Sequence, residues 1–488
     1  MQQNIAIVGS GFLGMTLAKR LADAGANVTL FESAGEIGGP ASVWRIGDVV
    51  WDKHYNVVLA SDKYTRSIIE ELGLANDLRW VEARVGFYSD GELVSMSNTM
   101  DFLKFPPFDL INKIRLGLTI FYASRVKDLR RLEQITVEQW LTKLSGKKTF
   151  EKIWKPLLMA KLGEAYEETA ASFIWASIQR MYSARRSGMK WEPFGYVRGG
   201  FARLLERFGE ALVESGVEIR LNSKVEAIER LANGKIKVTI PAARRHHDVK
   251  PTVVRPKTKY ASFTAASAVA PGYSGAFLTE PEVGTGCVVT MSPESTVSYF
   301  DKVIVTCPSN IAAKMLTQID ERESQMLENI RYQGILCASV VLKCSLSKYY
   351  VTHITDETPF TGIIEMSAIV DKREFKQDAV VYLPRYAAPD DQLFDKSDDE
   401  IETIFLNALE KMYLNFRRND VVAFKVWRVR QAFSIPLLNY SQSLPDMRTS
   451  VEGVYIVNSS HIVNGTVNIN ETIRLAESFF TRELQKDL

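Results

Sequence analysis

Apolar residues near the start of the chain follow the pattern of a strand, a helix and a second strand. Ile5–Val8 is a short continuous apolar run, as in a buried parallel strand. Gly25 ends the predicted helix, and Val28–Phe31 predicts the next strand. The apolar positions that predict the helix recur every three or four residues: Leu13, Leu17, Leu21 and Ala24.

The turn between this first strand and the helix contains Gly9, Gly11 and Gly14 in GxGxxG spacing. Such glycines allow a tight turn, a close approach of the backbone to a pyrophosphate, and close packing of the helix on the strand. The helix N-terminus also offers free N–H groups to phosphates. Glu32 ends the second strand, where it can accept a hydrogen bond from a ribose hydroxyl. The arrangement predicts a dinucleotide site, and the alternative is an ordinary glycine-rich turn.

Further along, the pattern alternates between two types of segment. Residues 100 to 190 are mostly helical in pattern, whereas a strand-and-helix pattern resumes near Gly199. After residue 320 the pattern predicts strands over Ile335–Leu342 and Val380–Leu383 and a helix over Asp398–Tyr413. Residues 241 to 285 lack apolar periodicity, which predicts an inserted surface loop or extra hairpin outside the buried sheet.

This alternation predicts two interleaved domains in an α/β fold. A Rossmann-like dinucleotide-binding domain is expected over residues 1–84, 195–319 and 437–488, with 241–285 as its insertion. An α+β substrate domain is expected over 85–194 and 320–436. Because ligand pockets favour domain interfaces, we expect the active site between the two domains, with a largely apolar wall.

A second glycine pair follows Glu32 closely, in the segment Glu36-Ile37-Gly38-Gly39-Pro40-Ala41-Ser42. This combination resembles the flavin-binding opening of the amine oxidase, protoporphyrinogen oxidase and phytoene desaturase superfamily. Later segments of the chain are similar to family segments as well, over residues 196–201, 225–228, 301–308 and 453–458. The resemblance implies an amine oxidase-like two-domain fold and FAD as the cofactor.

The resemblance also implies which residues bind FAD. In the family these are the glycine turn, the acid, the second glycine pair, the strand that meets adenine, and the C-terminal strand and helix start. In this chain they are Gly9, Gly11, Phe12, Leu13, Gly14, Glu32, Ser33, Gly38, Gly39, Pro40, Ala41, Val225, Pro308, Asn458, Ser459, Val467 and Asn468. The acid that often ends the family's closing strand is missing at Asn458. Because the last cysteine is Cys344, the C-terminal cysteine of covalent amine oxidases is missing too, and noncovalent FAD is expected.

Catalytic candidates are few, because in this family the flavin ring accepts the hydride and the protein mainly positions the substrate. Lys343, at a strand end, is similar to the lysine that many members hold near the flavin through a water. Lys161 lies in strongly apolar surroundings and is a comparable candidate. Arg385 and Tyr386 follow a predicted strand, where a guanidinium can bind an anionic substrate group. The alternatives are surface lysines and a structural ion pair.

The histidines divide by position. His54 and His461 adjoin segments that resemble flavin contacts, so we expect them closer to the flavin than His246, His247 or His353. No metal-ligand spacing is present, and no metal site is predicted.

Composition narrows the function classes. The 488 residues include 60 basic and 58 acidic side chains, a net charge of +2, which gives no electrostatic footprint for nucleic acid. The four cysteines form no CxxC pair, so reduced thiols in a cytoplasm are expected. A strand that begins within five residues of Met1 predicts no signal peptide, and no apolar run predicts a transmembrane helix.

The stretch from Lys113 to Arg131 combines basic and aromatic residues. The favoured interpretation is a helix whose apolar side faces the core and whose basic side is solvated. Weak peripheral contact with a membrane surface is the alternative.

The favoured function is an FAD-dependent oxidoreductase, namely an oxidase, dehydrogenase or desaturase. It would remove a hydride from a C–N or C–C bond of a small, partly apolar substrate and pass electrons to an external acceptor such as oxygen or a quinone. Two alternatives stay open: a redox-neutral flavoenzyme resembling UDP-galactopyranose mutase, and a non-catalytic protein resembling the GDP-dissociation inhibitors. The sequence does not predict the oligomeric state.

Overall fold

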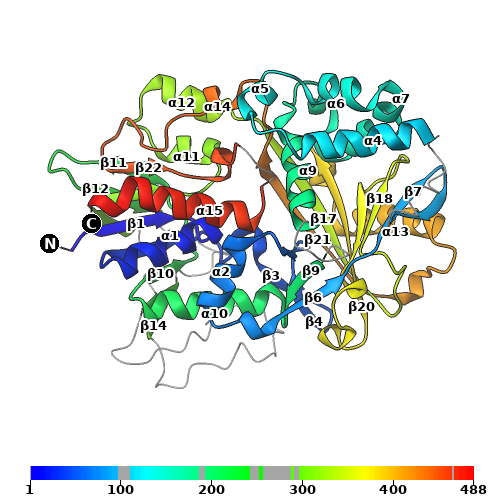
Figure 1. Cartoon of the computed structure of the whole chain (residues 1–488). Coiled ribbons are helices and arrows are strands. Elements are labelled where there is room, and N and C mark those ends of the chain that lie inside the picture. Colours follow the sequence, from blue (N-terminus) through cyan, green and yellow to red (C-terminus); the bar gives the residue numbers. More distant parts are fainter. Residues whose placement is uncertain are drawn as a thin grey trace.

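The computed structural model describes residues 2–96, 110–185, 193–241, 252–255, 287–290, 296–463 and 467–487. The described residues form two lobes, and both chain termini lie in the same lobe (Figure 1). The chain passes between the lobes more than once, because each lobe is assembled from segments that are far apart in the sequence. We call the lobe with the termini the nucleotide lobe and the other the substrate lobe.

A seven-stranded sheet forms the centre of the nucleotide lobe, in the order β14-β13-β10-β2-β1-β16-β22. Its strands β10, β2, β1, β16 and β22 are all parallel. Parallel strands are covered on both faces and therefore consist of continuous apolar runs, as the start of the chain predicts. The strands are β1 (Asn4–Val8), β2 (Asn27–Phe31), β10 (Glu218–Leu221), β13 (Thr252–Arg255), β14 (Cys287–Thr290), β16 (Lys302–Val305) and β22 (Val454–Ile456).

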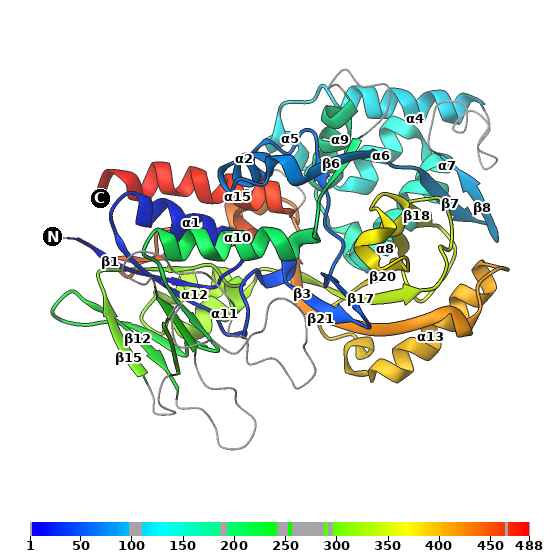
Figure 2. The ribbon, with the colours of Figure 1, turned by 90° about the horizontal axis from the view of Figure 1, so that it is seen from below.

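One layer covers each face of this sheet. Alternate residues of β1 point to opposite faces and therefore pack against different layers. Ile5 and Ile7 pack against a layer of helices that lie side by side, as Figure 2 shows. Ala6 and Val8 pack toward a small antiparallel sheet and two short helices. The first layer contains α1 (Phe12–Asp23), α2 (Lys63–Glu71), α10 (Gly200–Glu214) and α15 (Ile469–Phe479). The second contains β11 (Ala227–Arg230), β12 (Ile236–Ile240), β15 (Thr296–Phe300), α11 (Ser309–Met315) and α12 (Glu321–Glu328).

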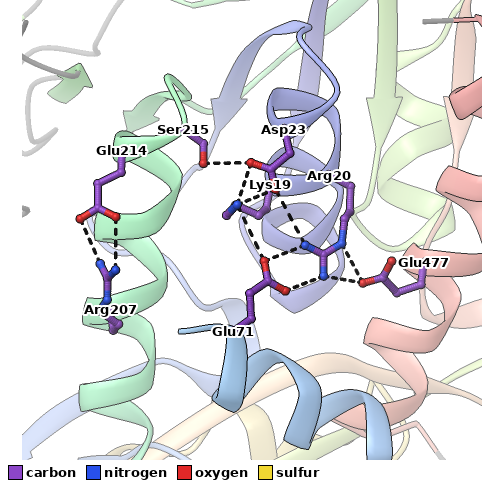
Figure 3. A network of polar contacts seen from close by, with 8 residues as sticks. All are labelled: Lys19, Arg20, Asp23, Glu71, Arg207, Glu214, Ser215 and Glu477. Carbon is purple, nitrogen blue, oxygen red and sulfur yellow. Dashed lines mark hydrogen bonds and ion pairs between the residues drawn. The ribbon is translucent and has the colours of Figure 1, made fainter. Parts of the chain in front are cut away.

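Ion pairs join the helices of the first layer at their outer ends (Figure 3). Arg20 of α1 binds both oxygens of Glu71 in α2, at 2.8 and 2.7 Å, and its Nε donates to Glu477 of α15 at 2.9 Å. This double contact raises the pKa of Arg20 above its ordinary value, mainly through the bond to Glu71. The planar guanidinium fork therefore fixes three helices relative to one another.

The predicted insertion is not wholly outside the central sheet, which corrects the prediction for residues 241–285. β13, which lies within these residues, pairs antiparallel with β10. β14, which follows them, pairs with β13, so both strands extend the sheet at its edge. The reason is local composition: Thr252-Val253-Val254 is a β-branched run, and β10 presents an unpaired edge to it. The remainder of the insertion lies outside the described residues.

A second seven-stranded sheet forms the centre of the substrate lobe, in the order β21-β17-β20-β19-β18-β7-β8. All eleven residues of β17 are buried, because helix α13 (Asp398–Met412) covers one face of the sheet and the nucleotide lobe lies toward the other. The strands are β7 (Val85–Ser89), β8 (Glu92–Ser95), β17 (Tyr332–Leu342), β18 (Val351–Ile354), β19 (Gly362–Glu365), β20 (Ala379–Ala387) and β21 (Val421–Ser434).

A block of helices covers the end of this sheet, around a core that includes Trp140, Phe150 and Phe433. The predicted capping box at Thr136 is present, since its side chain and that of Gln139 bond to each other's backbone N–H groups. The helices are α4 (Leu110–Ala123), α5 (Leu129–Glu133), α6 (Val137–Ser145), α7 (Lys147–Thr149), α8 (Lys155–Leu162), α9 (Ser172–Arg185) and α14 (Tyr440–Ser443).

Small sheets connect the two lobes. The hairpin of β3 and β4 leads from the second glycine pair to the interface, where Trp51 packs against Phe375. The packing also shifts the predicted domain boundary at residue 320. Leu327 of α12 still belongs to a core of the nucleotide lobe, and the chain enters the sheet of the substrate lobe at Tyr332. The connecting strands are β3 (Val43–Ile46), β4 (Val49–Asp52), β5 (Val58–Leu59), β6 (Leu78–Glu82) and β9 (Pro193–Val197).

Helix α4 forms where the pattern predicts it, but its orientation differs from the favoured prediction. Leu116 and Ala123 face the core, together with the polar residue Thr119. Ile111 and Leu118 face solvent instead, with 72% and 60% of their surface exposed. The apolar side of this helix is therefore wider than the part that the block of helices buries.

Candidate functional site

The glycine turn has a backbone that only glycine fits at two of its three positions. Gly9 has φ +107°, and a Cβ there would lie 2.6 Å from Oγ1 of Thr306. A Cβ on Gly14 would lie 1.9 Å from the carbonyl oxygen of Gly9. Both glycines are thus required by the packing of α1 on β1 and β16, whatever binds there.

Gly11 differs from the other two, and this difference tests whether a pyrophosphate fits the turn. Its φ of −65° suits any residue, and a Cβ there would meet no atom within 4 Å. In the described part of the chain no side chain caps α1, and the first turn of this helix contains no acidic residue. The N–H groups at its start therefore have no side-chain acceptor among the described residues. Free donors beside open space fit an anionic group such as a pyrophosphate. Phe12 and Leu13, the first helical residues, contribute this backbone while their side chains pack in the core.

The second glycine pair lies directly against this turn. The N–H of Gly38 donates to the carbonyl oxygen of Ser10 at 2.9 Å, and Gly11 and Gly38 form a parallel bridge. Gly38 and Gly39 have φ +113° and +55°, and a Cβ on Gly39 would lie 3.3 Å from the Cα of Gly11. The short helical turn Gly39–Ala41, which includes Pro40, then leads away from the site.

Glu32 is held in place by four donors. Its Oε2 accepts from the N–H and hydroxyl of Ser10 at 2.9 and 2.6 Å. Its Oε1 accepts from the N–H of Ala34 at 2.8 Å and the hydroxyl of Ser33 at 3.1 Å. The two N–H groups fix the carboxylate, whereas the two hydroxyls can rotate and leave acceptor sites to a ribose. The donor set therefore fits the role predicted for Glu32 and Ser33.

The remaining predicted cofactor residues lie at or near the starts of later elements of the chain. Val225 is buried just before β11, and Pro308 precedes α11. Asn458 is a buried hub: its Nδ2 donates to the carbonyl oxygen of Cys307 at 2.9 Å, and its Oδ1 accepts from the hydroxyl of Ser460 at 2.6 Å. Neighbouring positions are Ser459, which starts a short helical turn, Val467, which packs between the cores of both lobes, and Asn468, which caps α15.

Between the lobes, four side chains from three separate parts of the chain meet in one polar and aromatic cluster. The ring of His54 lies 4.1 Å from that of Tyr55. The hydroxyl of Tyr55 lies 3.1 Å from that of Tyr386 on β20. The Nζ of Lys161, at the end of α8, stands 3.7 Å from the centre of the Tyr386 ring. We call His54, Tyr55, Lys161 and Tyr386 the interface cluster.

Burial changes the protonation of this cluster. It lowers the pKa of Lys161 to about 7, since no acidic group in the described part of the chain faces the ammonium. Burial, together with the charge of Lys161, lowers the pKa of His54 to about 3, so this ring is neutral at pH 7. The Nε2 of His54 is buried without a hydrogen-bond partner among the described residues. A lysine that is partly neutral at pH 7 and an unpartnered ring nitrogen are groups that a bound substrate can use.

Asp52 lies beside the cluster and was not predicted as a site residue. Its Oδ1 accepts from the N–H of Phe201 at 2.9 Å, so the carboxyl caps the start of α10. Burial raises its pKa to about 7, against the lowering effect of the bonds from Phe201 and Asn56. The carbonyl oxygen of Asp52 also accepts from the hydroxyl of Tyr382. Asp52 therefore links both lobes at the site.

A large groove of about 1250 Å³ lies in the substrate lobe, next to the interface cluster. Tyr386 belongs to both, because its ring forms part of the groove wall and its hydroxyl contacts Tyr55. The wall also includes Pro156, Met159 and Ile435, which give it an apolar section. A partly apolar molecule fits such a passage.

The structure brings together only some of the predicted catalytic residues. Lys343 is exposed, and its Nζ donates to the carbonyl oxygen of Asn419 at 2.7 Å. Lys343 directly follows β17 and is six residues from Cys337. Cys337 pairs with Trp427, whose ring lies beside His54. Six strand residues span about 20 Å. Lys343 is therefore away from the interface cluster, because its strand continues past the site.

Arg385 lies within β20 and not after it, next to the cluster residue Tyr386, but its own side chain is separate from the cluster. Alternation along a strand turns Arg385 to the face opposite Tyr386, although both residues line the groove. His461 has an Nδ1 that accepts from the N–H of Asn458 at 3.3 Å, and its burial lowers its pKa. No contact between His461 and the interface cluster is found among the described residues.

The other histidines are distributed as follows. His353 lies on β18, where its ring contacts Phe87, and burial lowers its pKa to about 4. His246 and His247 lie outside the described residues. Sequence reasoning missed Tyr55 and Trp427 as partners of His54. The only available signal was the adjacency of Tyr55 to His54 and a tryptophan within a later strand, and neither indicates a contact across the lobes.

Neither a metal site nor a membrane-spanning helix is found among the described residues. No group of three or more histidine, cysteine or acidic side chains could hold a metal ion there. No helix in that part of the chain is both long and apolar enough to cross a membrane.

Comparison with known families gives a match over most of the chain. Residues 14–249 and 281–469 match the family model described as flavin containing amine oxidoreductase. The match includes the last glycine of the turn, Glu32, the second glycine pair and the interface cluster.

Similar proteins were also found by sequence and by structure. The zeta-carotene desaturase of Synechocystis sp. is 24% identical over 48% of this chain and 52% of its own length. The chain thus spans about half the length of this curated relative. A candidate protoporphyrinogen oxidase from Exiguobacterium sp. 255-15 superimposes over the whole of both chains with a TM-score of 0.69 at 17% identity. A reduced UDP-galactopyranose mutase superimposes with a TM-score of 0.61 at 13% identity, over 98% of this chain and 95% of its own chain. At these identities the structures establish the two-domain fold.

Proposed function

This chain belongs to the family of flavin-containing amine oxidoreductases, and from that premise we propose that it is an FAD-dependent oxidoreductase acting on a small, partly apolar substrate. It removes a hydride from a C–N or C–C bond of that substrate. The observation that carries the proposal is the interface cluster, where a lysine with a lowered pKa and an unpartnered histidine nitrogen meet between the cofactor segments and the groove.

FAD is proposed to bind noncovalently along the nucleotide lobe. The N–H groups at the start of α1 would receive the pyrophosphate beside Gly11, and Glu32 would receive the adenosine ribose. The three cysteines whose side chains are described are free. When bound, FAD supplies the acceptor of the hydride.

The interface cluster then handles the proton that accompanies the hydride. An amine is protonated at neutral pH and must lose a proton before it can lose a hydride. Lys161 fits this step, because burial holds its pKa near 7 and leaves a large fraction of its Nζ able to accept a proton. The face of the Tyr386 ring, 3.7 Å away, favours the ammonium that this transfer forms. The contact between the hydroxyls of Tyr55 and Tyr386 holds the Tyr386 ring in this orientation.

The substrate is proposed to enter along the groove. Its wall combines apolar side chains with Arg385, whose Nη1 reaches the carbonyl oxygen of Thr358 only at 3.5 Å. Arg385 therefore suits an anionic or strongly polar end of the substrate that remains in the groove while the apolar part reaches Tyr386. The electrons leave to an external acceptor, such as oxygen or a quinone.

The test is an anaerobic screen of the purified yellow protein, in which bleaching of the flavin band reports reduction. Amines and polyenes represent the proposed chemistry, and nucleotide sugars represent the redox-neutral alternative. Bleaching by an amine or a polyene supports the proposal. Turnover of a nucleotide sugar only after prior chemical reduction, with no net electron transfer, would favour the mutase-like alternative. A colourless protein that cannot take up FAD would favour a non-catalytic role.

A further inference from the structure

Helix α4 lies at the outer edge of the substrate lobe (Figures 1 and 2). Several of its apolar side chains are exposed to solvent. Five of the thirteen large hydrophobic residues exposed in the described part of the chain belong to this helix, so apolar exposure is concentrated there. They are Ile111 (72% exposed), Ile114 (54%), Leu118 (60%), Phe121 (46%) and Tyr122 (51%). We call these five residues the α4 face.

The spacing of these residues places them on one side of the helix. Positions 111, 114, 118, 121 and 122 span a stripe about 100° wide at 3.6 residues per turn. The inward side, by contrast, includes Lys113 and Thr119 as well as Leu116. A helix selected only for packing into the lobe would have the more apolar side inward, so the α4 face requires a different partner.

Basic residues lie beside the α4 face, most of them at its C-terminal end. Residues 110–133 contain six basic and two acidic side chains, and one of the acids, Glu133, is buried and accepts from Ser441. The guanidinium of Arg125 lies 4.2 Å from the centre of the Phe121 ring, at the C-terminal end of the stripe. Arg115 lies at its edge, beside Gly146. Other exposed basic residues continue from the end of α4: Lys127, Arg130 and Arg131.

We propose that the α4 face docks this protein onto the surface of a membrane that contains anionic lipid. The apolar stripe would lie at the level of the acyl boundary, and the arginine and lysine side chains would extend to the lipid phosphates. A polybasic rim next to an apolar stripe matches both layers of such a surface. The proposal does not depend on the proposed activity, although a membrane location suits a partly apolar substrate.

The geometry favours contact in the membrane plane. The fourteen residues of α4 extend about 21 Å, which is shorter than the roughly 30 Å apolar core of a bilayer. The stripe also runs along one side of the helix only, and the other side packs in the lobe. The helix can therefore lie on the bilayer without leaving the fold.

A second copy of this chain fits the α4 face less well. A symmetric dimer brings the same surface of both copies together. The rims of basic residues would then face each other, and the described rim offers Asp128 as its one exposed acid. Like charges at such an interface oppose association, whereas anionic lipid neutralises them.

The experiment measures co-sedimentation of the FAD-loaded full chain with two kinds of vesicle, phosphatidylcholine alone and phosphatidylcholine with about 30% phosphatidylserine. Wild type is expected to bind the anionic vesicles and to be released by high salt. Leu118→Glu introduces a charge in the centre of the stripe and should lower the bound fraction about tenfold. Leu414→Glu is the matched control, because Leu414 is 89% exposed and lies just after α13, away from the α4 face. This variant should bind the vesicles as wild type does. Flavin content and melting temperature check that both variants are folded.

The outcomes separate the occupants of the α4 face. Loss of vesicle binding in Leu118→Glu but not in Leu414→Glu supports the proposal. Wild type that fails to bind anionic vesicles overturns it, as does equal binding by the two variants. A wild-type dimer that Leu118→Glu converts to a monomer, without vesicle binding by either protein, overturns it in favour of a second copy of the chain.

Discussion

The sharpest test of the cofactor site is Gly11→Val. This glycine has ordinary backbone angles and open space where a Cβ would lie, so valine is compatible with the folded protein without FAD. Gly14 would not serve, because a Cβ there lies 1.9 Å from the carbonyl oxygen of Gly9 and would disturb the fold itself. At Gly11 the only group that the new side chain displaces is the ligand.

The size of the effect follows from the donors at the start of α1. A pyrophosphate pushed away from this turn loses at least two charge-assisted hydrogen bonds, each worth about 1.5–3 kcal/mol. The loss of about 3–6 kcal/mol weakens FAD binding by about 10² to 10⁴-fold. The free energy of unfolding of the protein without FAD should change by no more than about 1 kcal/mol, since a glycine is replaced at an unstrained position.

The assay combines FAD titration of the apoprotein with thermal unfolding in the absence of FAD. Gly117→Val is the matched control, because Gly117 also has open space around it but lies on α4, away from the turn. The control should bind FAD as wild type does. If Gly11→Val binds FAD with unchanged affinity, the pyrophosphate does not lie beside Gly11 and the assignment of the turn is wrong.

Three further predictions concern the interface and the helix layer. In wild type the rate of flavin reduction by an amine should rise through pH 7 as Lys161 becomes neutral, and Lys161→Met should lack this rise. An unchanged pH profile of the rate in stopped-flow measurements would exclude Lys161 as the proton acceptor. For Asp52, the raised pKa means that the native state binds more protons than the unfolded chain between about pH 4 and pH 7, so wild-type stability falls as pH rises through that window. Asp52→Asn should therefore gain in melting temperature relative to wild type from pH 4 to pH 7 and then level off, and a constant difference across this range would contradict the burial of the charge. Arg20→Lys should lower the free energy of unfolding by about 1 kcal/mol and leave the FAD content unchanged. The reason is that an ammonium cannot bind Glu71 through two nitrogens and reach Glu477 as well. Denaturant unfolding measures the change, and a midpoint equal to that of wild type would show that the guanidinium fork contributes nothing.

The sequence alone determined the nucleotide lobe to a large extent. Strand, glycine turn and helix are local features, because hydrogen bonding and sterics within some thirty residues specify each of them. The φ of Gly9, the close approach of Gly14 to Gly9 and the acceptor position of Glu32 are all consequences of that local pattern. The family resemblance extended the prediction to the second glycine pair, which the structure places against Gly11.

Only the tertiary structure decided which distant residues meet. The interface cluster joins His54 and Tyr55 to Lys161 and Tyr386, which are more than a hundred residues away, and no periodicity encodes a contact across two lobes. Lys343 and Arg385 looked similar to Lys161 in sequence, but strand length and alternation turned them away from the cluster. The same holds for α4: apolar spacing predicts a helix and its stripe, but whether that stripe faces the core or solvent depends on the neighbouring helices, which bury the other side.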